Sequence, residues 1–163
     1  LAPWKGVHFI LDALTQVPDV QLLIAGDGPE LERLQTLAQP ISDRVTFLGR
    51  LPSEQVSLYM KAADYFVLYS GYEGLPHTIL ESYRAGTPVI ASNKGGNPEV
   101  VKHEVNGYLV PFANPEALAA TIRQAFQSGQ REELAQNLQI DLEKFQFERM
   151  VAETDRVLKT FLP

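Results

Sequence analysis

The chain has 163 residues, 45% of them hydrophobic and 21% charged, which is enough for one globular domain with a hydrophobic core. It contains no cysteine, which excludes disulfides and thiolate metal sites, and its net charge of −6 argues against nonspecific binding to nucleic acid. No apolar run approaches the roughly 20 residues that a membrane-spanning helix needs.

Short apolar runs typical of buried strands alternate with stretches in which apolar residues recur at helical spacing. Helices are expected over residues 7–17, 29–38, 53–63 and 76–85, with a short helical turn at 99–102. Strands are expected over residues 20–25, 45–48, 65–69, 89–92 and 107–110. Strands separated by single helices imply right-handed crossovers, so the pattern predicts an α/β fold whose parallel sheet carries helices on both faces.

The sequence also predicts burial, facing and capping for individual elements. Residues 20–25 form a nearly continuous apolar run, as expected of a strand buried on both faces. Leu37 and Tyr59 are expected to face inward from their helices, and Ser53 to cap the helix that carries Tyr59. The remainder is expected to be helical over residues 115–127, then to about residue 144, and finally over an apolar stripe that forms a packing face at 147–161.

Glycine- and proline-containing loops follow the expected strands, at residues 26–28, 49–51, 70–76 and 93–98. In a parallel sheet of this kind, ligands bind at the carboxyl ends of the strands. We therefore expect these loops to lie at one edge and to share one pocket.

Two glutamates, Glu73 and Glu81, enclose seven residues in the third of these loops and the helix after it. Helical side chains lean toward the N-terminus, so Glu81 is expected to reach back toward an opening turn with free amides at Leu75, His77 and Thr78. Carboxylates accept hydroxyl hydrogen bonds and a helix start attracts anions, so this layout suits a ligand with hydroxyl and phosphate groups. The alternative is a solvated loop charge at Glu73 and an exposed helix residue at Glu81.

A series of motifs in this chain resembles the C-terminal half of retaining GT-B glycosyltransferases, of the type called glycosyl transferases group 1 or family 4. The resemblance extends over about residues 1–128 and includes the runs at residues 5–6, 26–29, 45–49, 70–76, 80–82, 85–92, 95–101 and 106–107. It implies a Rossmann-like, doubly wound parallel sheet and a site for a UDP-, GDP- or ADP-linked sugar.

The resemblance also implies roles for individual residues. Glu73 would be the catalytic residue and bond hydroxyls of the donor sugar, Glu81 would hold the ribose, and Lys5 would contact the diphosphate. The donor-binding set it implies is Lys5, Gly26, Leu51, Gly74, Leu75, Pro76, His77, Thr78, Glu81, Gly95 and Gly96. Leu51 would line the base, and Gly95 with Gly96 would allow close backbone approach near the sugar. By themselves, Lys5 reads as a solvated lysine and the glycines at 26, 95 and 96 read as turn residues.

The sequence has no Asp-x-Asp and no histidine cluster at metal spacing. This agrees with the metal-independent chemistry that the resemblance implies, in which basic side chains and helix dipoles offset phosphate charge. No metal or cofactor is expected beyond the donor substrate itself.

The family pattern places an arginine and a central strand ahead of Leu1, so we expect residues 1–163 to be one nucleotide-sugar-binding domain, with a helical tail at 130–163, cut from a longer two-domain protein. The N-terminal domain would bind a carbohydrate or lipid-linked acceptor, and the segment alone would be inactive. A cytoplasmic enzyme of cell-envelope polysaccharide synthesis, peripheral at the inner face of the membrane through that domain, fits the family's habits. The alternatives are a GT-B epimerase or phosphorylase, and a non-catalytic nucleotide-binding or assembly module.

Overall fold

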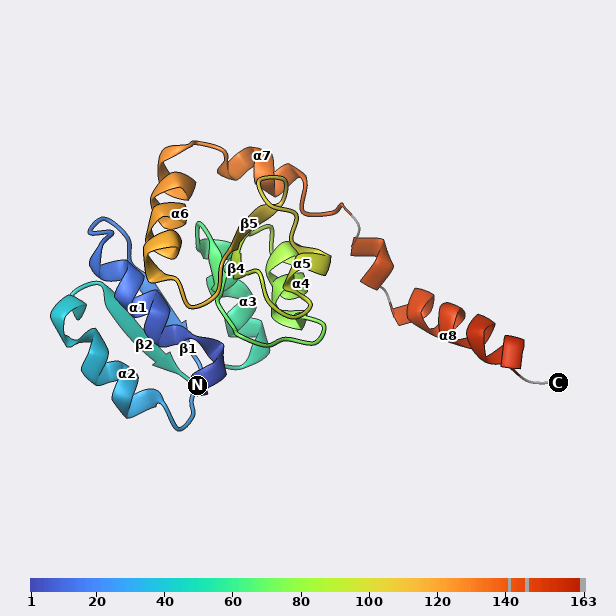
Figure 1. Ribbon diagram of the computed structural model, residues 1–163, viewed down its shortest axis with the longest axis horizontal. Helices are drawn as coiled ribbons and strands as arrows, with labels where there is room; N and C mark the ends of the chain where they lie inside the picture. The colour runs from blue at the N-terminus through green and yellow to red at the C-terminus, as the bar shows by residue number, and fades with distance from the viewer. Residues whose placement is uncertain (141, 146, 162–163) are drawn as a thin grey trace.

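The computed structural model describes residues 1–140, 142–145 and 147–161. Helices and strands alternate along the chain, as the pattern predicts (Figure 1). The strands are β1 (Leu22–Ala25), β2 (Val45–Gly49), β3 (Phe66–Leu68), β4 (Val89–Ser92) and β5 (Gly107–Val110). The helices are α1 (Val7–Thr15), α2 (Leu31–Ala38), α3 (Ser53–Ala62), α4 (His77–Arg84), α5 (Asn97–Val100), α6 (Pro115–Gln127), α7 (Arg131–Gln136) and α8 (Phe147–Phe161). Short 3-10 turns lie at η1 (Pro3–Lys5), η2 (Gln39–Ile41) and η3 (Leu142–Phe145).

All strand pairs are parallel, which confirms the predicted α/β fold. The strands form two sheets, one of β1 and β2 and one ordered β3-β4-β5. β4 lies between β3 and β5 and is buried along its whole length, including the polar Ser92. The predicted single sheet is therefore divided, because β1 and β3 are not hydrogen-bonded to each other.

Helices cover both faces of the three-stranded sheet. Ile90 of β4 packs in a cluster with residues of α1 and α6, such as Ile10 and Leu118. Its neighbours Val89 and Ala91 belong to a second cluster, with residues of α4. This alternation follows from the two-residue period of a strand, and it places the core on both sides of β4.

The expectation that residues 20–25 are buried on both faces is wrong. Ile24 is buried in a cluster with Leu11 of α1 and Leu34 of α2, whereas Leu23, which points to the opposite face, is 48% exposed. The apolar run reports a strand correctly, but α1 and α2 cover it from one side only.

Several helix details also differ from the sequence-based expectations. Leu37 and Tyr59 are exposed, because Ala38 and Met60 take the buried positions beside them. Ser53 is the first residue of α3 and makes no capping bond, and Pro52 stands at the N-cap. The expected turn at 99–102 lies two residues earlier, as α5.

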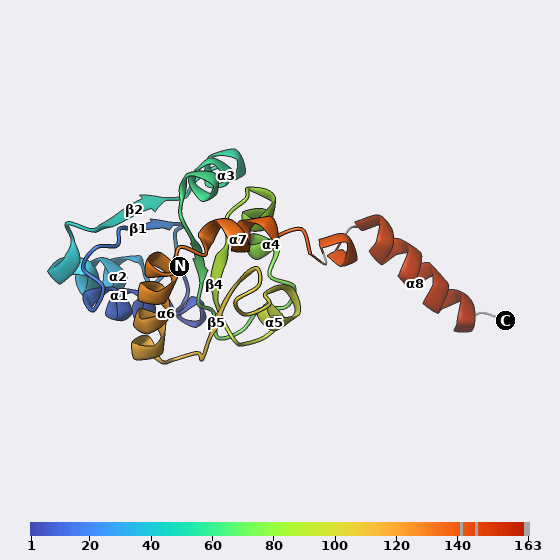
Figure 2. The ribbon, with the colours of Figure 1, turned by 90° about the horizontal axis from the view of Figure 1, so that it is seen from above.

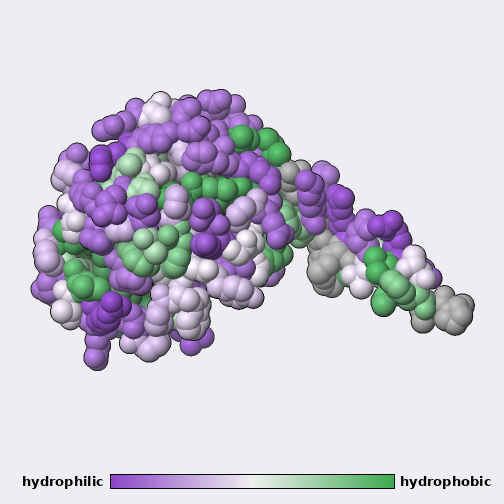
Figure 3. Space-filling view, viewed as in Figure 1, coloured by the Kyte–Doolittle hydropathy of each residue, from purple (hydrophilic) through white to green (hydrophobic). Residues whose placement is uncertain are grey.

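The C-terminal part departs most from expectation. The helix expected to run to about residue 144 ends at Gln136 of α7, and the 3-10 turn η3 follows. Helix α8 extends away from the rest of the molecule in two perpendicular views (Figures 1 and 2). Its expected packing face is exposed at Val151, Leu158 and Phe161, and a hydrophobic patch is visible on it in Figure 3. The side chains expected to complete that face at 147 and 150 lie outside the described residues.

Arg44 joins the two-stranded sheet to the end of α1. Its guanidinium donates to the backbone oxygens of Val17 at 2.7 Å, Leu14 at 3.2 Å and Val20 at 3.3 Å. The Leu14 oxygen also accepts the Val17 amide at 3.1 Å, whereas the oxygens of Val17 and Val20 lie after the helix, so Arg44 mainly supplies partners to carbonyls of the α1–β1 connection.

We expect Arg44→Met to lower the free energy of unfolding by about 1.5–3 kcal/mol, because it keeps the aliphatic stem but removes charged hydrogen bonds. Denaturant titration measures the change. Arg123→Met is the matched control, because Arg123 is exposed on α6. Equal losses for the two variants would contradict the role assigned to Arg44.

Candidate functional site

Lys5 and Glu73 form an ion pair, although 68 positions separate them in the sequence. The Lys5 ammonium donates to Oε1 of Glu73 at 2.7 Å, and the two side chains are 40% and 15% exposed. Lys5 ends the turn η1, and Glu73 lies in the loop between β3 and α4. The structure thus brings together the cation and the carboxylate that the sequence predicted at one site.

Close backbone packing holds η1 against the β3–α4 loop. Gly6 has a φ of 65°, and a Cβ there would collide with the carbonyl oxygen of Tyr69. A second backbone contact lies beside this one, where the Gly71 amide donates to the Trp4 oxygen at 2.7 Å. Only glycine fits at position 6, and its close approach fixes the position of Lys5.

Hydrogen bonds of the Tyr69 side chain also hold the end of β3 in place. Its hydroxyl donates to the oxygen of Pro111 and accepts the amide of Asn114 at 3.2 Å. Burial raises the pKa of Tyr69, so the phenol stays protonated and remains a donor. β3 is thereby tied to the connection between β5 and α6.

The loop after β4 packs directly on the loop that carries Glu73. The Gly96 amide donates to the Glu73 oxygen at 2.9 Å. A Cβ at Gly95, which has a φ of 57°, would overlap the Glu73 backbone, and one at Gly96 would overlap the oxygen of Gly74. In this structure the two glycines allow one loop to pack on another, and their approach to a donor sugar stays a prediction.

A buried polar cluster lies beneath these loops, and the sequence analysis missed it. The side-chain amide of Asn97 donates to the backbone oxygen of Ser92 at 3.1 Å and to its Oγ at 3.0 Å. Ser92 Oγ in turn donates to the Ser70 oxygen at 2.5 Å. All three residues are fully buried. The sequence did contain a sign of this cluster, because Ser70 and Ser92 are polar residues at the ends of two apolar strand segments.

The start of α4 offers fewer free amides than expected. The His77 amide donates to the Leu75 oxygen at 2.9 Å, so the expectation that it is free is wrong. The reason is the tight turn at Pro76, the N-cap residue. Within the described residues no hydrogen bond involves the amides of Leu75 and Thr78, and these two remain available to an anion.

Glu81 lies in the middle of α4 and is exposed, one helical turn after His77 on the same face. Its carboxylate makes no hydrogen bond or ion pair within the part of the chain that the structure describes. Glu73 thus precedes the start of α4 and Glu81 follows it, which is the order in which the prediction placed them.

Gly26 and Leu51 belong to a separate set of contacts. The Gly26 amide donates to the Gly49 oxygen at 2.7 Å, which joins the ends of β1 and β2, and half-buried Leu51 follows directly. These contacts unite the first two predicted loops with each other. They do not reach the cluster around Glu73.

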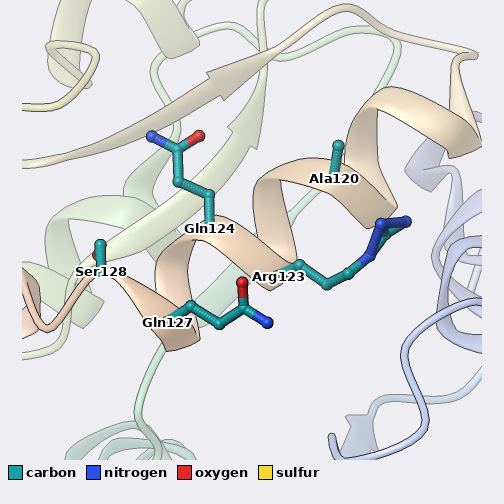
Figure 4. A pocket seen from close by; sticks show the side chains of 5 residues that line it. All are labelled: Ala120, Arg123, Gln124, Gln127 and Ser128. Atoms are coloured by element: carbon teal, nitrogen blue, oxygen red, sulfur yellow. The ribbon is translucent and has the colours of Figure 1, made fainter.

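Away from these loops, the described residues include a surface hollow but no metal-binding cluster. Among residues 1–140, 142–145 and 147–161, no group of three or more histidine, aspartate or glutamate side chains is placed to hold a metal ion. A hollow on the surface of α6 is lined by Ala120, Arg123, Gln124, Gln127 and Ser128 (Figure 4). It is built from a single helix and its C-cap and includes no predicted site residue, so it is not the candidate site.

No described helix is long and apolar enough to cross a bilayer.

We expect Gly96→Ala to lower the free energy of unfolding by about 1–3 kcal/mol, because the added methyl group would push the two loops apart. Gly96 has ordinary helical backbone angles, so the effect would be steric rather than conformational. Gly74→Ala is the matched control, since a Cβ there meets nothing within 4 Å. Chemical denaturation of both variants checks this, and equal stabilities would contradict the close packing.

Comparison with known proteins identifies the family. The profile of the family described as Glycosyl transferases group 1 matches residues 1–140. An uncharacterized glycosyltransferase of Methanocaldococcus jannaschii is 33% identical over 162 residues, which cover 95% of this chain and 42% of that protein. A GDP-mannose-dependent phosphatidylinositol monomannoside mannosyltransferase of Mycobacterium tuberculosis is 34% identical over 135 residues, covering 75% of this chain and 35% of the relative.

Solved structures agree with the sequence relatives. The crystal structure of Anabaena Alr3699/HepE in complex with UDP superposes with a TM-score of 0.88 at 30% identity, covering 98% of this chain and 46% of the Anabaena chain. The present chain spans less than half the length of these relatives. The parallel α/β fold and the matches over most of its length show that the chain belongs to the glycosyl transferases group 1 and has the fold of a GT-B C-terminal domain.

Proposed function

We propose that this chain is the donor-binding domain of a retaining, metal-independent hexosyltransferase. It would bind a nucleoside diphosphate sugar and support transfer of the sugar to an acceptor hydroxyl with retention of the anomeric configuration. The observation that carries the proposal is the contact between Lys5 and Glu73 beside the start of α4, where two amides are unpaired.

In this proposal the reacting end of the donor lies between Glu73 and α4. Glu73 bonds hydroxyl groups of the sugar, and Lys5 with the amides of Leu75 and Thr78 stabilises charge on the departing diphosphate. Preorganised donors of this kind supply the largest electrostatic contribution to many group transfers. The close packing of Gly95 and Gly96 on the Glu73 loop supports such preorganisation.

The nucleoside end would extend toward the other loops at the same strand ends. Glu81 holds the ribose hydroxyls, and Leu51, with Gly26 nearby in the joined loops, lines the base. The relatives support a hexose donor, since one is a GDP-mannose-dependent mannosyltransferase and Anabaena HepE was crystallised with UDP and UDP-glucose. The base and the sugar would be read from binding experiments.

We further propose that the domain works within a longer two-domain chain. The division between β1 and β3 supports this, because a strand placed between them would restore one continuous sheet. The reaction would then take place between the domains, with acceptor choice in the other one. A carbohydrate or lipid-linked acceptor of envelope polysaccharide synthesis, and a cytoplasmic enzyme peripheral to the membrane, fit the phosphatidylinositol monomannoside mannosyltransferase among the relatives.

The proposed chemistry uses no metal ion. Lys5 and the dipole of α4 would balance the negative charge of the diphosphate. No other cofactor is proposed.

We expect Glu73→Ala in the full-length enzyme to reduce turnover by about 100-fold or more, because it removes a group aimed at the reacting sugar. The measurement is the rate of sugar transfer from a panel of UDP-, GDP- and ADP-sugars, with the anomeric configuration of the product read by NMR. Glu132→Ala, on exposed α7, is the control. Wild-type turnover in Glu73→Ala would defeat the assignment, and epimerised nucleotide sugar without transfer would indicate an epimerase instead.

We expect Glu81→Ala to act mainly on affinity, raising the dissociation constant of the nucleotide by about tenfold or more, because hydrogen bonds to a charged group contribute strongly. Isothermal calorimetry of the full-length protein with each nucleoside diphosphate measures this. Glu99→Ala removes an exposed carboxylate from α5 and serves as the control. An unchanged affinity in Glu81→Ala would remove the ribose role.

A further inference from the structure

The Lys5 ammonium is bound to an anion, the Glu73 carboxylate, at 2.7 Å. The proposed function, on which this inference rests, requires the same ammonium to bind a diphosphate. We infer that Glu73 is a specificity-determining residue that disfavours the bare nucleoside diphosphate relative to the sugar nucleotide, because carboxylate and phosphate compete for Lys5.

The environment of Glu73 strengthens the competition between its carboxylate and the phosphate for Lys5. The Glu73 side chain is only 15% exposed, so water screens its charge less than it would at the open surface. Among the described residues, Lys5 is the one basic side chain that pairs with Glu73. When phosphate oxygens attract Lys5, the carboxylate loses part of its compensation and faces a second anion.

The backbone prevents Glu73 from relieving that repulsion by moving away. Its carbonyl oxygen accepts the Gly96 amide at 2.9 Å. Gly95 and Gly96 lie so close to residues 73 and 74 that neither position has room for a Cβ. The η1 turn is fixed as well, by the bond between the Gly71 amide and the Trp4 oxygen.

A sugar nucleotide and a bare nucleoside diphosphate differ at this carboxylate. The sugar brings hydroxyl groups that donate to Glu73 and replace the bond to Lys5. The bare diphosphate brings no such donor, and its terminal phosphate carries additional negative charge. Glu73 therefore favours the substrate over the product, and after transfer the carboxylate regains Lys5 as the diphosphate leaves.

The test uses calorimetry on the full-length protein with UDP, GDP and ADP, and with UDP-glucose and GDP-mannose as intact donors. Glu73→Gln keeps the shape of the side chain and removes its charge. We expect it to bind the preferred bare diphosphate about threefold to tenfold more tightly than the wild type, while affinity for the matching sugar nucleotide does not increase. The gain should shrink as salt concentration rises.

Two further variants separate this effect from general changes in charge. In a Lys5→Met background, Glu73→Gln should give a smaller gain, because there is no ammonium to compete for and only the repulsion between carboxylate and diphosphate is relieved. Glu132→Gln removes one exposed carboxylate from α7 and should leave all affinities unchanged. Circular dichroism and thermal melting of each variant would confirm that the proteins compared are folded.

The outcomes distinguish this inference from the proposed function. If the wild type binds none of the nucleotides, the proposed function fails and the inference fails with it. If the wild type binds nucleotide but Glu73→Gln binds the bare diphosphate equally or more weakly, the inference alone is overturned. A gain of the same size in the Lys5→Met background, or in Glu132→Gln, would also overturn it.

Discussion

The contact between two loops at the ends of β3 and β4 is the constraint on which the candidate site depends. Gly95 and Gly96 bring one backbone against the other at residues 73 and 74, with no space for side chains between them. Beneath them, Asn97, Ser92 and Ser70 form a hydrogen-bonded cluster that is closed to solvent. The hydrogen bonds among these buried groups favour one arrangement, because breaking them leaves further polar atoms unpaired away from water. The position of the Glu73 carboxylate is therefore determined by residues that follow it by about one strand and one helix.

Local pattern was sufficient for most of the fold. The run at residues 89–92 predicted a strand, and β4 is buried along its length because it has a strand on each side and helices on both faces. The run at β1 predicted burial on both faces and was wrong, since Leu23 is exposed. A run of apolar residues indicates that a strand prefers burial. The arrangement of the whole chain decides which helices cover that strand. Leu37 and Tyr59 are exposed for a similar reason, since the neighbouring Ala38 and Met60 face the core instead.

The site was predictable in part. Spacing within one segment was enough to place Glu73 before α4 and Glu81 on it, and family resemblance added Lys5. The sequence had no means of showing that Lys5 and Glu73 bond directly, since that contact depends on how η1 packs against the end of β3. The His77 amide was assigned as free from the general rule for helix starts, and the local turn at Pro76 decided otherwise. The Asn97 cluster went unnoticed because its partners come from three separate elements.

Helix α1 belongs to both hydrophobic clusters that flank the division of the sheet. Ile10 packs toward the three-stranded sheet, and Leu11 toward β1 and α2. Residues 20–49 therefore form a unit attached through one face of α1, the Arg44 bonds and the bonds that Leu1 makes to Asp27 and Glu30, and local units of this kind can open in native proteins. Opening of this unit would break the Leu1 bonds and move the Gly26 loop away, while the bond between the Gly71 amide and the Trp4 oxygen keeps Lys5 on Glu73. In native-state hydrogen exchange, the amides of β1 and β2 should accordingly lose protection before those of β4.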